Sequence, residues 1–76
     1  MPEGSMIGTR IRERRVMNGI RQSDLARMVG ISPSYLNLIE HNRRRIGGKT
    51  LLKLAEALEV EPSALSEGAE ATLLAT

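Results

Sequence analysis

Apolar residues recur along this chain with the spacing of short amphipathic helices, and no segment shows the strict alternation of a half-buried β-strand. The clearest repeat lies in KTLLKLAEALEV, where one helix face collects Leu51, Leu54, Ala55 and Leu58. Shorter repeats occur in IGTRIRERRVMNG, QSDLARMVG and SPSYLNLIEHN. The pattern predicts an all-α protein, folded as a compact bundle of four to five short helices.

Residues with particular backbone preferences mark the ends of these helices. Ser32 is suited to cap the start of a helix, and Pro33 fits the first helical position because its missing N–H is not needed there. Gly19 and Gly30 are placed to end the first two helices, and Gly30 allows a turn with positive φ that a side chain would strain. A fifth short turn is expected to begin at Pro62.

Two short helices joined by a tight, glycine-containing turn form the most informative unit, QSDLARMVG-I-SPSYLNLIEHN. In this arrangement the second helix projects from the first and is able to lie in the major groove of DNA. At helical spacing, Leu36, Ile39 and Glu40 fall on one inner face. The outer side carries Ser34, Asn37, Leu38 and His41, with Pro33 at its leading end and Tyr35 at its flank.

This outer side has the chemistry needed to read base edges. Asparagine donates to and accepts from adenine, and the serine hydroxyl is able to donate to or accept from a base edge. An exposed leucine contacts a thymine methyl group. Base contacts are therefore predicted for Ser34, Asn37, Leu38 and Pro33, with Asn37 as the main candidate. An ordinary polar helix face with one stray leucine is the alternative interpretation.

Glu40 stands out because its carboxylate is expected on the inner face, where a charge without a partner is costly. Arg15 follows Ile7 and Ile11 on the inner face of the first helix. A structural ion pair between Arg15 and Glu40 is therefore expected.

The net charge of +2 conceals an asymmetry along the chain. Between Gly8 and Thr50 there are ten Lys or Arg and three acids, whereas the remainder holds one Lys and six acids. One end of the folded protein is therefore predicted to be basic and the other acidic. A solvated face without any partner is the alternative interpretation of such a run of charges.

Composition excludes several classes of protein. The 76 residues are enough for one domain, and the absence of cysteine rules out disulfides and thiolate metal sites. No apolar run is long enough to span a bilayer, so a cytoplasmic protein without membrane contact is expected. The single histidine, His41, lacks the partners of a zinc site, and neither a cofactor nor an enzymatic activity is expected.

The segments RIRERR, NGIRQSDLARMVGIS, LNLIEHNRR and LLKLAEALEV together resemble the Cro/C1-type (XRE) helix-turn-helix DNA-binding domain. The resemblance implies a lambda-repressor-like fold and sequence-specific binding of double-stranded DNA by a bacterial or phage-type transcriptional regulator, with residues 32–41 as recognition helix. It also implies that Gln22 binds a phosphate and that Arg15 pairs with Glu40. More narrowly, SYLNLIEHNRR and GGK are similar to the N-terminal domain of longer bacterial regulators of short-chain fatty-acid metabolism.

The resemblance also places the loop after the recognition helix beside the DNA backbone. Phosphate contacts supply affinity and register rather than sequence preference. The predicted phosphate contacts are Arg21, Gln22, Tyr35, His41, Arg43, Arg44, Arg45 and Lys49. The chain departs from the family where Arg21 replaces the usual capping Ser or Thr, and where Pro33 and Ser34 stand at a position in which Gln is frequent.

Members of this family commonly dimerise through their last helix, so a homodimer is expected. Leu65, Leu73 and Leu74 are the candidates for the dimer contact, and the alternative is that they cover the monomer's own core. The expected organisation is a disordered segment 1–6, a DNA-binding domain 7–67 and a C-terminal tail 68–76. The competing function is an antitoxin-like protein-interaction module with the same fold, and a small-molecule effector is not expected.

Overall fold

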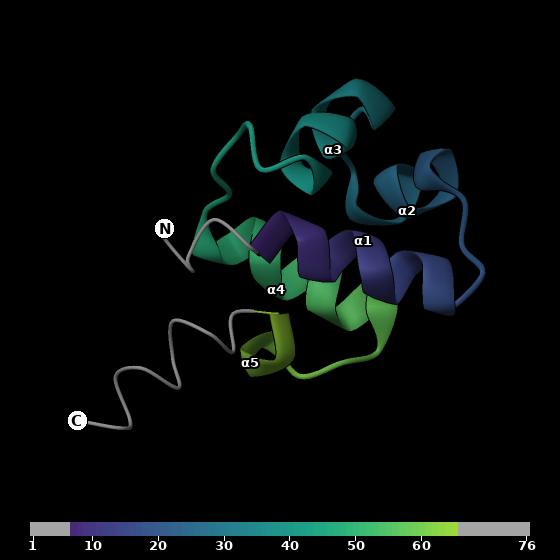
Figure 1. Ribbon diagram of the computed structural model, residues 1–76, viewed down its shortest axis with the longest axis vertical. Helices are drawn as coiled ribbons and strands as arrows, with labels where there is room; N and C mark the ends of the chain where they lie inside the picture. The colour runs from purple at the N-terminus through teal and green to yellow at the C-terminus, as the bar shows by residue number, and fades with distance from the viewer. Residues whose placement is uncertain (1–6, 66–76) are drawn as a thin grey trace.

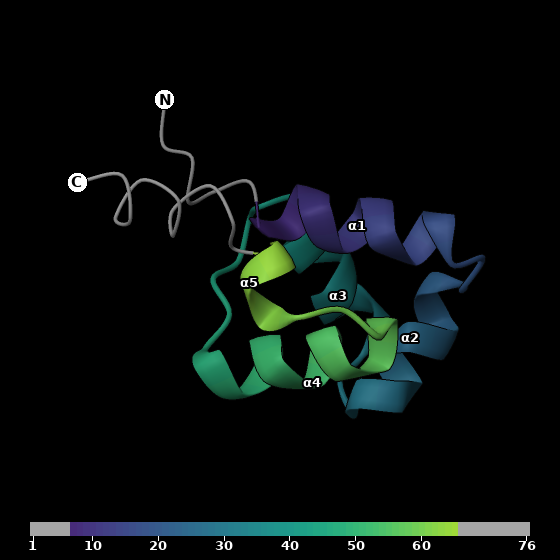
Figure 2. The same ribbon diagram turned by 90° about the horizontal axis from the view of Figure 1, so that it is seen from below.

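The computed structural model describes residues 7–65, which form five helices and contain no strand. Their bounds are α1 Ile7–Met17, α2 Gln22–Val29, α3 Pro33–Glu40, α4 Gly48–Leu58 and α5 Pro62–Leu65. Figure 1 shows α2 and α3 on one side of α1 and α4, and Figure 2 shows α5 between α1 and α4. The predicted all-α bundle is confirmed, whereas the expected terminal segments 1–6 and 68–76 lie outside the described residues. Within residues 7–65, no helix is long and apolar enough to cross a membrane.

An aliphatic core fills the space between the helices. Its buried side chains come from all five of them and are Ile11, Leu25, Ala26, Val29, Leu36, Ile39, Leu54, Ala55, Leu58 and Leu65. Leu65 is 0% exposed in the monomer, because α5 sets it against α1 and α4. The proposal of Leu65 as a dimer contact is therefore corrected in favour of its alternative, that this side chain covers the monomer's own core. Leu73 and Leu74 lie outside the described residues.

Of the five helices in residues 7–65, four end in the same way, with one residue in the left-handed region of the backbone just after the helix. These residues are Gly19, Gly30, Asn42 and Glu59. After each of them an N–H group returns to a carbonyl inside the helix, as Ile31 does to Ala26 at 2.9 Å. The two glycines were predicted to act in this way, whereas Asn42 and Glu59 were not. The last residue of α4 is Leu58, because Glu59 after it adopts the left-handed conformation. The helix therefore stops two residues before Val60, where the sequence pattern predicted its end.

The turn between α2 and α3 is fixed by local hydrogen bonds. Gly30 adopts a φ of 77°, and the Ser32 hydroxyl oxygen accepts a hydrogen bond from the Tyr35 N–H at 3.0 Å, as expected of a helix cap. Pro33 occupies the first turn of α3, also as predicted. This short connection therefore sets the direction in which α3 leaves α2.

A close contact between Gly8 and Asn42 holds the start of α1 against the end of α3. A Cβ atom built on Gly8 would lie 1.9 Å from the carbonyl oxygen of Ile39, so a larger residue does not fit without a shift. The Gly8 N–H, which has no partner within its own helix, donates to Asn42 Oδ1 at 2.9 Å. Asn42 Nδ2 in turn donates to Thr9 Oγ1 at 2.9 Å. Asn42, which lies just after the end of α3, therefore also caps the start of α1.

Replacing Gly8 with Ala should lower the free energy of unfolding by about 1–3 kcal/mol, because the added methyl group overpacks against backbone. Gly48→Ala is the matched control, since Gly48 also begins a helix and a Cβ there meets nothing within 4 Å. The control should be neutral or slightly stabilising. Urea unfolding followed by circular dichroism measures both variants, and equal stability of the two would contradict the close approach of α1 to α3.

Candidate nucleic-acid interface

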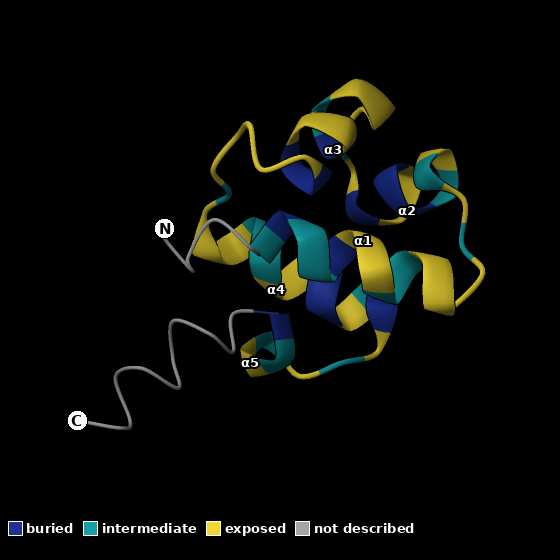
Figure 3. Ribbon diagram, in the orientation of Figure 1, coloured by how far each residue is buried: buried dark blue, intermediate teal, exposed yellow. Residues whose placement is uncertain are grey.

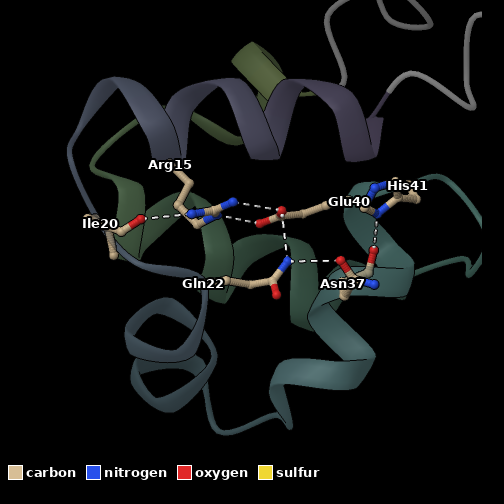
Figure 4. A network of polar contacts seen from close by, with 6 residues as sticks. All are labelled: Arg15, Ile20, Gln22, Asn37, Glu40 and His41. Carbon is tan, nitrogen blue, oxygen red and sulfur yellow. Dashed lines mark hydrogen bonds and ion pairs between the residues drawn. The ribbon is translucent and has the colours of Figure 1, made fainter.

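A buried ion pair joins α1 to α3 (Figure 4). The side chain of Glu40 is 0% exposed and that of Arg15 is 14% exposed. Arg15 Nε donates to Glu40 Oε2 at 2.7 Å and Nη2 donates to Oε1 at 3.1 Å, which is the strong two-pronged geometry of an arginine–carboxylate pair. Arg15 Nη1 also donates to the carbonyl oxygen of Ile20 at 2.9 Å. The expected pair is present, and the same guanidinium holds the turn that leads into α2.

Gln22 extends this network from the start of α2 to the outer side of α3. Its amide nitrogen donates to Glu40 Oε1 at 3.1 Å and to Asn37 Oδ1 at 3.3 Å (Figure 4). Both N–H groups of the amide are therefore used within the protein. The phosphate contact implied for Gln22 stays a prediction. The bond to Asn37 could not be predicted from the sequence, because it joins two helices whose relative position follows only from the folded structure.

The outer side of α3 is accessible, as Figure 3 shows by its exposed colour. The structure brings all four predicted base-contact residues to exposed positions in and around the first two turns, and these are Pro33, Ser34, Asn37 and Leu38. Tyr35 lies half-buried at the flank, as expected. The exposed His41 follows the helix, and its Nδ1 atom lies 2.8 Å from the Asn37 carbonyl oxygen.

A loop leads from α3 to α4 (Figure 1), and it carries exposed cations. This loop carries Arg43, Arg44 and Arg45, and Lys49 lies in the first turn of α4. The Arg44 guanidinium lies over the ring of Tyr35, 5.8 Å from its centroid, and this cation–π contact ties the loop to α3. Among the described residues, no ion pair involves Arg43, Arg45 or Lys49. These charges are therefore available to an anionic partner.

The start of α2 supplies the other flank, so that α3 lies between it and the cationic loop in both views of the fold (Figures 1 and 2). Arg21 stands at the N-cap position of α2 and provides no side-chain cap, as its departure from the family pattern predicts. Its side chain is 86% exposed and pairs loosely with Asp24, at 3.5 Å. Exposed pairs of this kind contribute little, so Arg21 remains free to contact an anion.

A helix-turn-helix family model matches residues 11–65 of this chain. Over 69 residues the chain is 38% identical to the HTH-type transcriptional regulator RamB of Mycobacterium tuberculosis, a match that covers 91% of this chain and 15% of RamB. The chain therefore spans only a small part of that relative's length.

Two solved structures combine a similar fold with a similar sequence. The P22 c2 repressor of Salmonella phage P22, in complex with synthetic operator 9T, has a TM-score of 0.76 and 39% identity, covering 82% of this chain and 94% of that chain. The restriction-modification controller protein C.AhdI from Aeromonas hydrophila has a TM-score of 0.75 and 39% identity, covering 78% of this chain and 86% of that chain. Both likenesses extend over most of the five helices described above.

Removing either partner of the buried ion pair alone, by Arg15→Met or Glu40→Leu, should cost about 3–5 kcal/mol of unfolding free energy, because the other charge is left buried without its partner. The double variant should recover much of this loss, since no buried charge remains unpaired. Arg21→Met, which breaks only an exposed pair, is the control and should leave stability nearly unchanged. If the double variant instead loses as much unfolding free energy as the two single variants together, the coupling between Arg15 and Glu40 is contradicted.

Proposed function

The chain belongs to the Cro/C1-type (XRE) helix-turn-helix family, and from this premise we propose that it binds double-stranded DNA sequence-specifically as a transcriptional regulator. Residues 32–41, which comprise α3 and its two flanking residues, act as the recognition helix in the major groove. The observation that carries this proposal is an exposed, uncharged helix face set between two groups of exposed cations. The uncharged face suits base edges, and the cations suit the two neighbouring phosphate backbones.

Base reading is assigned to the first two turns of α3. Asn37 offers an amide to a base edge, Ser34 offers a hydroxyl, and Leu38 offers an apolar surface to a thymine methyl group. Pro33 lies at the leading end of the same face and makes an apolar contact. Because the inner side of α3 is fully packed, this face is the one that remains for the groove.

Backbone binding is assigned to the two flanks of α3. On one side lie Arg43, Arg44, Arg45 and Lys49 together with Tyr35 and His41, and on the other side lies Arg21. The phosphate contact that the family resemblance implies for Gln22 is not needed for this assignment, because its amide N–H groups are engaged within the protein. Gly47 and Gly48 begin α4 without a side-chain cap, so their N–H groups add to the positive end of that helix. The P22 c2 repressor, which is similar in fold and sequence, was solved in complex with a synthetic operator, and this supports DNA binding by the present chain.

The regulator is proposed to act as a homodimer, because two copies of a helix-turn-helix domain read half-sites one helical turn apart. Its proposed location is the cytoplasm. No enzymatic activity is proposed. The narrower likeness to regulators of short-chain fatty-acid metabolism stays a prediction. The competing function, an antitoxin-like protein-interaction module, differs in what the loop arginines do, since it needs no phosphate contact from them.

Affinity for duplex DNA should fall steeply with salt, with log K decreasing by about 0.9 per tenfold change in salt for each phosphate contact. Replacing Arg43 and Arg44 with Ala should make the slope shallower by about two such contacts. Lys53→Ala is the matched control, because Lys53 is exposed on α4 and is not among the predicted contacts. Fluorescence anisotropy over a salt series measures the slopes. A slope unchanged by loss of both arginines would favour the protein-interaction module.

Asn37→Ala should cost about 1–3 kcal/mol of binding free energy on the preferred sequence and little on random duplex, because it removes a base contact. The preferred sequence is first obtained by selection from a random duplex pool, and a palindromic consensus is expected of a dimer. Competition binding on both kinds of duplex then measures the variant. Equal losses on the two would count against base reading by Asn37.

A further inference from the structure

We propose that Gln22 is a positioning residue that sets the base preference of Asn37, turning this asparagine into a hydrogen-bond donor that favours guanine. The inference rests on the proposed DNA-binding function and adds to it a cause for the sequence preference. It assigns to Gln22 a role other than the phosphate contact implied by the family resemblance. Three groups are linked in turn, namely the carboxylate of Glu40, the amide of Gln22 and the amide of Asn37 (Figure 4).

The carboxylate of Glu40 determines which way the Gln22 amide faces. Glu40 is fully buried, and both of its oxygens accept hydrogen bonds from Arg15, so it is held in place and offers only acceptors to Gln22. Gln22 therefore turns its nitrogen toward Glu40, and Nε2 lies 3.1 Å from Oε1. The opposite orientation would set a carbonyl oxygen against a carboxylate.

The fixed Gln22 amide then determines which way the Asn37 amide faces. The second N–H of Gln22 points at Asn37, and only the oxygen of the Asn37 amide is able to accept it, at 3.3 Å. In a planar amide the nitrogen lies on the other side, so the N–H donors of Asn37 are turned away from Gln22. Asn37 is exposed on the outer side of α3, and these donors are the part left for a base.

A donor in this position distinguishes guanine from adenine. In the major groove guanine presents two acceptors, N7 and O6, whereas adenine presents one acceptor and one donor. An asparagine with both groups free pairs well with adenine, but an asparagine whose oxygen is engaged by Gln22 loses part of that match. The network therefore favours guanine at the base pair that Asn37 contacts.

A direct phosphate contact from the Gln22 side chain would compete with this arrangement. Both of its N–H groups are engaged by Glu40 and Asn37, and the remaining oxygen is an acceptor, which a phosphate does not bind. The two roles differ in what they affect. A phosphate contact changes affinity for every duplex equally, whereas a positioning residue changes the ratio between bases.

The test uses the consensus selected by the wild-type protein and duplexes in which single base pairs of it are replaced. The base pair read by Asn37 is the one at which Asn37→Ala loses its preference. At that base pair the wild-type protein should favour guanine over adenine by about tenfold. Gln22→Met, of similar length but without hydrogen bonds, should reduce this ratio to about threefold or less while changing affinity for random duplex much less. Circular dichroism confirms that the variant is folded.

Two further variants separate positioning from a phosphate contact. In the Asn37→Ala background, Gln22→Met should no longer change any base ratio, because the residue through which it acts is gone. Arg43→Ala is the control for a pure phosphate contact and should weaken all duplexes alike without changing the ratio.

Three outcomes would overturn the inference. A wild-type preference for adenine at this base pair, or a base ratio unaffected by Gln22→Met with equal loss on all duplexes, would overturn it while leaving the proposed function intact. Failure of the wild-type protein to select any sequence would overturn the proposed function, and this inference with it.

Discussion

A buried carboxylate needs a hydrogen-bond donor for each of its oxygens, and Glu40 draws its donors from two other helices. Arg15 reaches it from α1 and Gln22 reaches it from α2, while Glu40 itself is the last residue of α3. Arg15 also holds the Ile20 carbonyl at the turn that leads into α2. The relative position of the first three helices therefore depends on satisfying one charge.

Further contacts also hold α3 in its position relative to the other helices. Ser32 caps its first turn, and Asn42 joins its end to the start of α1 through Gly8. With its inner side packed on an aliphatic core and both ends fixed, α3 presents one uncharged face to solvent. Repulsion among the exposed cations beside this face is tolerated in water and would be relieved by a polyanion. The same short helix, α3, therefore contributes to stability through its inner side and to the proposed DNA binding through its outer face.

Most of the fold could be predicted because each of its causes lies within a few residues. The three- and four-residue spacing around Leu54 and the glycine at position 30 identify helices and a turn without any tertiary information. The ion pair was also predictable, since a charge on an inner face requires a partner. The contacts of Asn42 with Gly8 and of Gln22 with Asn37 were not, because they depend on how separate helices meet. Leu65 stayed ambiguous because an apolar side chain does not indicate whether its own chain or a partner covers it.

The most direct test of the proposed role of α3 is a titration of the ¹⁵N-labelled protein with the selected duplex, followed by NMR. If α3 enters the major groove, the largest shift changes fall on Ser34, Asn37 and Leu38 and on the loop 43–45, while the buried residues of α4 and α5 change little. Shift changes confined to α4 and α5, with α3 unaffected, would contradict this role.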